Sequence, residues 1–367
     1  MGIQMVNSNQ FVNEVIDFLI IGGGVAGLAV ANRLVDLKKN PVLIEAKNYP
    51  SHKVCGEFLS PEVLPYLENW GITPECLIKE VHIFSNKDFL QFEFPSNAAC
   101  ISRYQMDFAL ANRIKKKGGY VLTNISVNEF KIKRNSSLYE VKLSDGKILT
   151  ARNIFIGAGR IFKATTDNQK PLPYFGFKAH FKGIDLEERL EMHLLPRAYL
   201  GISQIEKNVI NIACLAKIDP KMMNQPQKFI ENLLNTPAAY RIKEKMNHTQ
   251  MIFDEWLFTP APHYKAKQNP PLKNVYYIGD AAGTLPPATG AGLSLALYSG
   301  YMAAEYAIRE ETEAYQFFWN KCYEGKILIG NILHHVMLNP VLAKTSFYCC
   351  HFFPSLKKKI FFSMRSF

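Results

Sequence analysis

Three glycines and one glutamate near the N-terminus have the spacing of a nucleotide-binding turn. Gly22, Gly24 and Gly27 follow a short apolar segment, and Glu45 comes 18 residues after the last glycine. In such a turn the first glycine permits a tight bend, the second permits close approach of a pyrophosphate, and the third lets the helix pack against the strand. The alternative is a glycine-rich turn that binds no ligand.

The segments around these residues predict the elements that position them. An apolar run at residues 18–21 predicts a buried strand, residues 25–37 a helix, and residues 41–45 a second strand that ends in Glu45. The N-terminus of the helix would offer free N–H groups to phosphates. The Glu45 carboxylate would accept hydrogen bonds from both ribose hydroxyls and repel a 2′-phosphate. Three neighbouring residues complete the expected contacts: Val25, Ala26 and Ala46.

A second glycine-rich signature follows far along the chain. Residues 275–280 predict another buried strand, which ends in Gly279 and Asp280, and Gly290 and Gly292 come at the start of a predicted helix. Gly279 would permit close approach of a ligand, and Asp280 would accept from a ribose or ribityl hydroxyl. Amides at the helix start favour a ring that carries negative charge. The alternative is two unrelated glycine turns.

Size and composition predict a globular protein with two domains. The chain has 367 residues, of which 48% are hydrophobic and 20% charged. No apolar run reaches the length of a membrane span, and the first residues do not have the pattern of a secretion signal. Seven cysteines form no CxxC pair and no zinc-like cluster with histidine, so no metal site is expected. We therefore expect a cytoplasmic location.

The net charge of +11 is concentrated at the C-terminus. Residues 325–367 contain six lysines or arginines and no acidic residue. No nucleic-acid-binding module is visible, so nucleic acid is not an expected partner. Aromatic residues alternate with the basic residues of this tail, and they predict weak peripheral contact with a membrane. The alternative is a helical tail that packs on the body with solvated lysines.

The strand and helix patterns divide the α/β chain into four parts. Residues 14–170 would form the first part of the nucleotide-binding domain, with a small strand insertion at about 80–100. Residues 171–271 would form a mixed-sheet domain for substrate, residues 272–310 would return to the first domain, and residues 311–367 would form a helical tail. Asp145-Gly146 predicts a hairpin.

The order of these motifs resembles the para-hydroxybenzoate hydroxylase-type flavoproteins, which include aromatic hydroxylases and geranylgeranyl reductases. The motifs are GGGVAG, Glu45, Arg103 at a helix start, GDAAG and PPATGAG. The stretch from Lys53 to Pro61, with Cys55-Gly56, is similar to the reductase-like branch. The resemblance covers about residues 15–310 and implies a Rossmann-like FAD-binding domain. It does not extend to the tryptophan halogenases, because their Trp-x-Trp-x-x-Pro signature is absent.

The resemblance also implies roles for individual residues. Glu45 would bind the adenosine ribose, Arg103 the pyrophosphate or ribityl chain, and the Val127 backbone the adenine. Gly279 and Asp280 would contact the ribityl-pyrophosphate side, and Gly290 to Gly292 the isoalloxazine. The family usually has an Asp-Gly motif where this chain has residues 157–160, Gly-Ala-Gly-Arg. FAD remains the expected cofactor, but direct use of NAD(P)H is in doubt, and a separate reductase is an alternative donor.

The expected activity is FAD-dependent oxidation of a hydrophobic small molecule, first of all as a monooxygenase. The alternatives are a reductase of isoprenoid or polyene double bonds and a flavin-binding protein without turnover. Cys55 would lie near the flavin or serve as a small buried residue. His180 and His193, with Tyr174 and Tyr199, would face the substrate or be structural. No catalytic acid or base is predicted, because the flavin carries the reaction.

Overall fold

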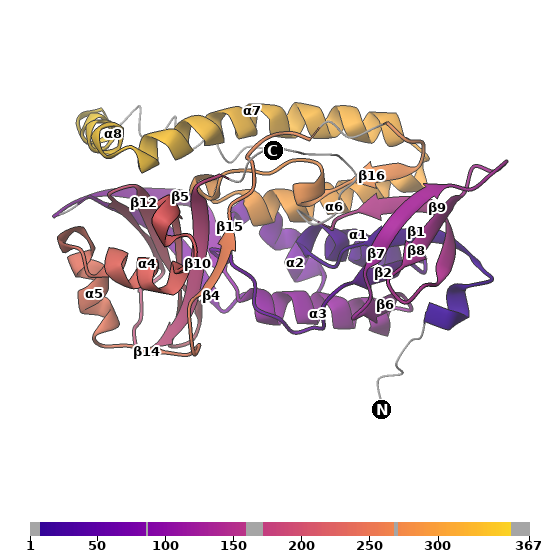
Figure 1. Cartoon of the computed structure of the whole chain (residues 1–367), viewed down its shortest axis with the longest axis horizontal. Helices are drawn as coiled ribbons and strands as arrows, with labels where there is room; N and C mark the ends of the chain where they lie inside the picture. Colours follow the sequence, from indigo (N-terminus) through magenta and orange to yellow (C-terminus); the bar gives the residue numbers. More distant parts are fainter. Residues whose placement is uncertain (1–7, 86, 159–171, 268–270, 354–367) are drawn as a thin grey trace.

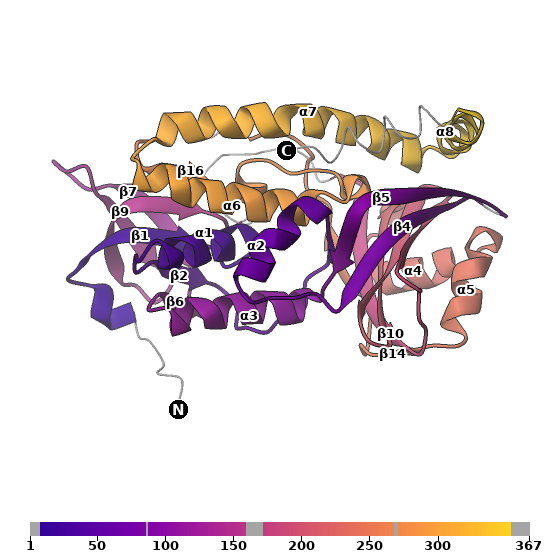
Figure 2. The same cartoon turned by 180° about the vertical axis from the view of Figure 1, so that it is seen from behind.

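Two β-sheets form two lobes that lie side by side (Figures 1 and 2). The computed structural model describes residues 8–85, 87–158, 172–267 and 271–353. Helix α7 (Thr312–Leu338) runs along both lobes and is followed by α8 (Pro340–Phe352). The α/β fold class predicted from the sequence is confirmed.

The first lobe has a mixed sheet in the order β6-β2-β1-β9-β8-β7, with β16 also paired to β9. Strands β6, β2, β1, β9 and β16 are parallel, whereas β8 and β7 continue the sheet as an antiparallel meander. The predicted hairpin at Asp145-Gly146 joins β8 to β9. The strand bounds are β1 (Val15–Ile21), β2 (Val42–Glu45), β6 (Tyr120–Thr123), β7 (Val127–Ile132), β8 (Tyr139–Leu143), β9 (Ile148–Ile156) and β16 (Val275–Tyr277).

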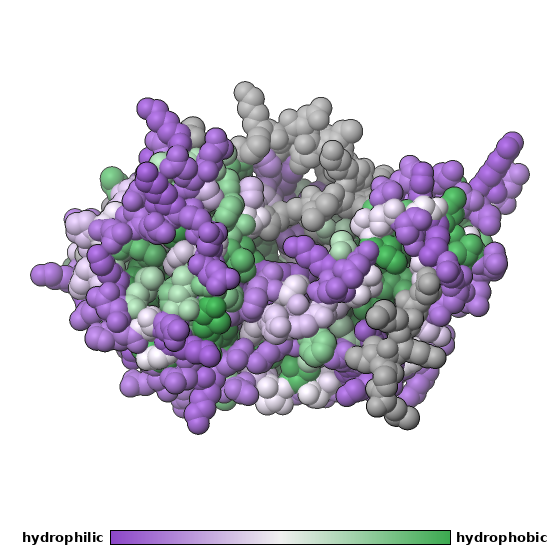
Figure 3. Space-filling model, turned by 60° about the horizontal axis from the view of Figure 1, so that its bottom comes forward, coloured by the Kyte–Doolittle hydropathy of each residue, from purple (hydrophilic) through white to green (hydrophobic). Residues whose placement is uncertain are grey.

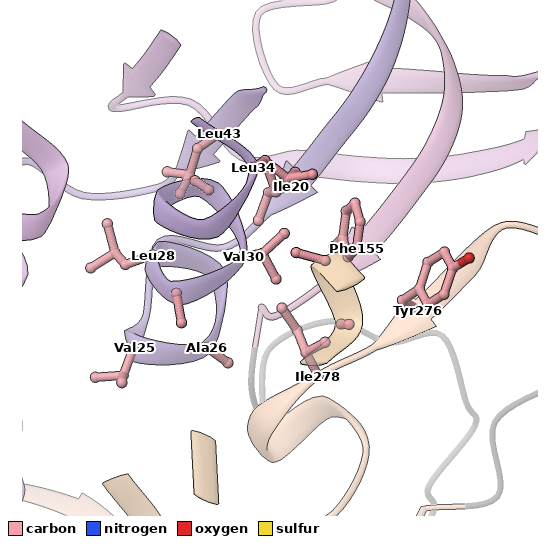
Figure 4. Close-up of a cluster of buried hydrophobic side chains, with 14 of the residues drawn as sticks. Ile20, Val25, Ala26, Leu28, Val30, Leu34, Leu43, Phe155, Tyr276 and Ile278 are labelled. Atoms are coloured by element: carbon pink, nitrogen blue, oxygen red, sulfur yellow. The ribbon is translucent and has the colours of Figure 1, made fainter. Parts of the chain in front are cut away.

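Helix α1 (Val25–Asp36) lies at the centre of the first lobe. Its side chains are mostly buried; Val30 and Leu34 point toward the strand residues Ile20 and Phe155, whereas Leu28 points to the opposite side of the helix (Figure 4). Helix α6 (Gly292–Ile308) packs closely on α1. A Cβ at Gly300 would lie only 2.2 Å from the Ala26 carbonyl oxygen, so only glycine allows this close approach. The close contact holds the start of α1 in a fixed position.

The second lobe has a larger sheet in the order β14-β10-β13-β12-β11-β4-β5-β3, with β15 also paired to β10. The strand insertion expected at about residues 80–100 is β4 and β5, and both belong to this second sheet, since β4 pairs in parallel with β11. The bounds are β3 (Phe58–Leu59), β4 (Cys76–Ser85), β5 (Asp88–Cys100), β10 (Tyr174–Lys182), β11 (Arg189–Leu195), β12 (Ala198–Glu206), β13 (Val209–Lys217), β14 (Gln250–Met251) and β15 (Leu257–Pro260).

The remaining helices cover the two sheets. Residues 61–69 form two short pieces, a 3₁₀ turn followed directly by a short α-helix. The other α-helices are α2 (Leu64–Asn69), α3 (Arg103–Lys116), α4 (Pro226–Leu234) and α5 (Tyr240–Met246). The 3₁₀ turns are η1 (Ser8–Phe11), η2 (Pro61–Val63), η3 (Pro220–Met222), η4 (Pro237–Ala239), η5 (Gly279–Ala281) and η6 (Pro287–Thr289).

The surface is mostly polar. Hydrophilic residues cover most of the face in Figure 3, and apolar residues appear there in small groups on both lobes. Within the described ranges, none of the helices combines the length and the apolar character that crossing a membrane requires.

Candidate functional site

The first glycine motif forms the predicted tight turn between β1 and α1. Gly22 has φ +101°, and a Cβ there would lie 2.6 Å from the Ala158 nitrogen. A Cβ at Gly27 would lie 2.0 Å from the Gly22 carbonyl oxygen, so helix and strand meet too closely for any side chain. By contrast, among the residues that the structure describes, none beyond the two chain neighbours of Gly24 has an atom within 4 Å of a Cβ built there. The turn therefore leaves open space at the glycine expected to face a pyrophosphate.

Glu45 lies at the end of β2 and faces this turn. Its Oε2 accepts a hydrogen bond from the Gly23 N–H at 2.7 Å, and its Oε1 accepts one from the Lys47 N–H at 3.1 Å. The Tyr49 hydroxyl donates to the Gly23 carbonyl at 2.5 Å. Burial, followed by the negative charges of Glu45 and Asp107, raises the pKa of Tyr49 well above its usual value, so this hydroxyl stays a donor. A carboxylate has further lone pairs, which fits the predicted ribose contact.

The second glycine motif meets the first at the start of α1. A Cβ at Gly279 would lie 2.9 Å from the Ala26 Cβ, although the two residues are far apart in sequence. The exposed Asp280 and Gly292 line one small recess with Gly279, together with Gly283, Leu285, Leu295, Ala296 and Tyr323. Gly290 has φ +64° and ends the turn η6 just before α6. Three of the four predicted residues of this motif thus line one recess.

Arg103 and Val127, both expected to contact the cofactor, lie in different surroundings. Arg103 is buried at the start of α3, and its Nε and Nη2 bind both carboxylate oxygens of Asp107 at 2.7 and 2.6 Å. Sequence reasoning did not foresee this pairing, which leaves Nη1 for another acceptor. Val127 starts β7 and is half-buried, and the Ile125 N–H nearby donates to the Glu45 carbonyl at 3.3 Å. The cofactor contacts expected of both residues stay predictions.

A buried cluster of charged residues lies between the two lobes, and it was not predicted from the sequence. Glu57 has no exposed surface, and its Oε1 accepts hydrogen bonds from the Arg103 N–H at 2.7 Å and from Lys178 Nζ at 2.5 Å. His180 Nε2 lies 2.8 Å from Glu57 Oε2. Glu57 directly follows Cys55-Gly56, and Lys178 and His180 alternate with core residues of β10. This alternation of polar and apolar residues along the strand is the sequence pattern from which a buried polar cluster could have been predicted.

The electrostatics of this cluster keep Glu57 ionised. Burial raises the pKa of Glu57, but the hydrogen bonds and positive charges of His180 and Lys178 outweigh it and hold the pKa below the usual range. Burial raises the pKa of the half-buried Cys55 thiol, which therefore stays protonated at neutral pH. Cys55 Sγ accepts a hydrogen bond from the Glu57 N–H at 3.4 Å. The thiol is thus a poor nucleophile here.

The other residues predicted to face a substrate lie in two different places. His193 is buried in β11, where its Nε2 lies 3.2 Å from Glu191 Oε2. Tyr174 and Tyr199 lie beside the end of α7 in one apolar cluster with Ala288 of the PPATGAG motif. His334 of α7 joins them, 5.0 Å from the Tyr174 ring. Burial lowers the pKa of His334 to about 4, so this imidazole is neutral at pH 7.

The donor set of the first lobe fits FAD. The open position at Gly24, the carboxylate of Glu45 and the recess between Asp280 and Gly292 follow one another around the start of α1. These are the residues from which the sequence predicts the pyrophosphate, ribose and ring contacts, and those contacts stay predictions. Residues 159–160 of the Gly-Ala-Gly-Arg segment lie outside the described residues, as do Lys357 and the residues after it in the tail.

Several solved structures share this fold. A geranylgeranyl bacteriochlorophyll reductase-like protein from Thermoplasma acidophilum matches with a TM-score of 0.72 and 18% identity, over 90% of both chains. A protein described as a probable FAD-dependent monooxygenase, from Pseudomonas aeruginosa, matches with a TM-score of 0.73 and 15% identity, over 90% of this chain and 98% of its own. The flavin-dependent brominase Bmp2 has a TM-score of 0.73 at 16% identity, over 95% and 93%. The chain therefore shares its overall α/β fold with these proteins.

Comparison of sequences finds only distant relatives. No family model matches the chain. A menaquinone reductase from Mycobacterium tuberculosis strain H37Rv is 21% identical over 332 residues, which cover 80% of this chain and 77% of the relative. The same enzyme from strain CDC 1551 matches equally well.

Proposed function

We propose that the protein is an FAD-dependent oxidoreductase that acts on a hydrophobic small molecule. The observation that carries the proposal is the meeting of the two glycine motifs at the start of α1, where Gly279 contacts Ala26. Two loops that are both needed to cradle an extended dinucleotide lie side by side there. The FAD-dependent monooxygenases and halogenases that share this fold support the assignment.

The residues of the cradle would divide the binding of FAD between them. The first amides of α1, at Val25 and Ala26, would donate to the pyrophosphate, and Gly24 gives it room. Glu45 would accept from the adenosine ribose while it braces the Gly23 amide. The N-terminus of α6 at Gly292 would face the isoalloxazine ring. When bound, the flavin supplies the exchange of two electrons with the substrate or with oxygen.

Two reactions fit this cradle, and each has its own support. Monooxygenation is the first candidate, because one neighbour in fold is a probable FAD-dependent monooxygenase. Reduction of a double bond or a quinone-like substrate is the second, because the curated relatives are menaquinone reductases and the chain has the Cys55-Gly56 pair. Incubation under ¹⁸O₂ separates them, since only monooxygenation puts the label into the product.

The first test is whether the purified protein binds FAD. A flavin absorbance band that survives gel filtration would support the proposal, and failure to reconstitute with added FAD would contradict it. Gly24→Val fills the open position and should abolish retention of FAD. Gly325→Val, at an exposed position of α7 that also has room for a side chain and has no positive φ, serves as a control for folding.

The electron donor is tested in the same cuvette. Anaerobic addition of NADPH and then of NADH should bleach the flavin band if NAD(P)H reduces it directly. A persistent band would point to a separate reductase as the donor. A protein that retains FAD but turns over with no donor would be a flavin-binding protein without activity.

The cytoplasmic location and the weak membrane contact are proposed from the sequence. A cytoplasmic protein that touches a membrane weakly through its C-terminal segment would gain access to an apolar substrate. In the described part of that segment, Val341, Phe352 and Phe353 are exposed. Phe352→Ser with Phe353→Ser should reduce co-sedimentation with anionic vesicles, whereas Phe317→Ser, an equally exposed change on α7, should not. Equal binding of both variants would count against the contact.

A further inference from the structure

The loop that carries Cys55 is held almost entirely by side chains of the second lobe. We call residues 53–57 the Cys55 loop. The Lys53 carbonyl accepts from Lys178 Nζ at 3.1 Å, the Cys55 carbonyl from Asn211 Nδ2 at 3.0 Å, and the Gly56 carbonyl from the Ser203 hydroxyl at 3.2 Å. The loop lies between β2 of the first sheet and β3 of the second, and these three of its backbone carbonyls accept hydrogen bonds from side chains of the second sheet.

The residues that hold the loop form a row across three neighbouring strands. His180 of β10 pairs in register with Asn211 of β13, and Asn211 pairs with Ser203 of β12. Residues paired in this way point to the same face of a sheet, and Lys178 lies on that face two residues from His180. We call Lys178, His180, Ser203 and Asn211 the polar row. All four are buried, so the sheet presents a preformed set of donors to the loop.

Glu57 connects the polar row to the first lobe. It accepts hydrogen bonds from Lys178 and from the first amide of α3, and it contacts His180. The Glu57 backbone has φ +58°, a left-handed conformation that is unfavourable for residues other than glycine. Such a conformation persists only where the surroundings fix it. The charge-assisted contacts of its side chain are the interactions that do so.

The exposed side of the loop faces open space. Apart from its two chain neighbours, no residue in the described part of the chain has an atom within 4 Å of a Cβ built at Gly56, and Gly56 itself is exposed. The N–H of Ser60, just beyond the loop, donates to the Ser294 hydroxyl at 2.9 Å, near the start of α6. The Cys55 loop therefore begins near Arg103 and Asp107 and leads toward the helix that would face the flavin ring.

From this geometry we propose that Glu57 is a positioning residue, which fixes the Cys55 loop against the polar row as a rigid wall of the flavin site. This inference rests on the proposed function only in its second part, the contact with FAD. Its first part concerns the protein without FAD. The loop would not act as a mobile lid, since opening it would leave the buried Lys178 without its carboxylate partner.

The experiment compares Glu57→Gln with Glu191→Gln. Glu191 is also buried and also contacts a histidine and a lysine, together with Arg189 at 3.2 Å, but all of these partners lie within the second lobe. In the FAD-free protein, labelling of Cys55 by N-ethylmaleimide is followed by peptide mass spectrometry. We expect the labelling rate to rise at least about tenfold in Glu57→Gln, because one charge-assisted hydrogen bond is lost, and to stay within about twofold of native in Glu191→Gln.

The second readout is the affinity for FAD, measured by quenching of flavin fluorescence. We expect Glu57→Gln to weaken it about tenfold and Glu191→Gln to leave it unchanged. Equal labelling rates in the two variants would overturn the proposal, because a general loss of stability would then explain them. Faster labelling with unchanged affinity would overturn the contact with FAD.

A third variant keeps the proposal testable if Glu57→Gln does not fold. Asn211→Ala removes only the hydrogen bond to the Cys55 carbonyl and should raise the labelling rate severalfold. If the native protein itself binds no FAD, the proposed function fails, while the labelling rates still test whether Glu57 and the polar row hold the loop.

Discussion

Glu57 and Glu191 are both buried glutamates that contact one histidine and one lysine, yet they join different parts of the molecule. Glu57 links the start of α3 in the first lobe to β10 in the second. Glu191 lies in β11, and its partners are His193 and Arg189 of the same strand and Lys245 of α5, all within the second lobe. The same residue types thus hold two lobes together in one place and one helix on its sheet in the other.

The two clusters also differ in their access to water. The Lys178 side chain is fully buried, whereas 22% of the Lys245 side chain is exposed. Water and salt screen the second pair more than the first. We infer that loss of one partner is far more costly between the lobes than at the edge of the second lobe.

The largest expected effect comes from removal of the buried cation. Lys178→Met leaves the Glu57 carboxylate buried without its lysine, which should lower the free energy of unfolding by about 3–5 kcal/mol. Lys245→Met should lower it by about 1 kcal/mol or less, since Lys245 is partly exposed. Urea unfolding followed by circular dichroism measures both values. An equal loss of unfolding free energy in both variants would contradict the inference that the cluster between the lobes is the more costly one to disrupt.

The second prediction concerns acid. Burial raises the pKa of Glu191, but the hydrogen bonds and charges of His193 and Lys245 lower it to about 2. Its contribution is therefore present above the usual pKa of a glutamate and is lost as the pH falls from about 5 to 2. That contribution is about 3 kcal/mol at roughly 1.4 kcal/mol per pKa unit.

Free energies of unfolding at several pH values between 2 and 7 test this prediction. The difference between the native protein and Glu191→Gln should shrink as the pH falls through this range. Glu57→Gln should behave in the same direction, because the pKa of Glu57 is also lowered. A difference that does not change with pH would show that the Glu191 pKa is not depressed.

The smallest expected effect separates the Cys55 loop from the rest of the sheet. Ser203→Ala removes the hydrogen bond to the Gly56 carbonyl, and Gln204→Ala removes the one that its Oε1 accepts from the Leu186 N–H at 3.0 Å. Each change should cost about 1 kcal/mol of stability. Only Ser203→Ala should speed the labelling of Cys55. Faster labelling in both variants would contradict the proposal that the polar row holds the Cys55 loop.

Sequence reasoning identified the parts of the site that are local in the chain. The turn at Gly22, its following helix and the strand ending in Glu45 lie within about thirty residues, so spacing alone predicts their arrangement. The strands of the second lobe were also readable, because apolar residues such as Phe175, Phe177 and Phe181 alternate with polar ones. The contact between Gly279 and Ala26 was not predicted, since no local sequence pattern brings together residues so far apart in the chain.

The contacts between the lobes could not be read from the sequence. Glu57 meets Lys178 and His180 more than 120 residues later in the chain, and the pairing depends on how the two sheets dock. The capture of Arg103 by Asp107 is local, one helical turn apart, but an i,i+4 pair looks the same whether it is exposed or buried. Strand β4 joins the second sheet through parallel pairing with β11, a register that only the tertiary structure sets.

Helix α7 has a mechanical consequence for the whole molecule. Its 27 residues, about 40 Å at 1.5 Å per residue, are buried against the first lobe at Tyr315 and Trp319 and against the second at His334 and Met337. The helix therefore restricts movement of one lobe relative to the other. A hinge motion between them would have to bend this helix or pull its buried side chains away from one lobe. An apolar substrate is therefore expected to enter through local rearrangement of side chains, with the distance between the lobes held constant.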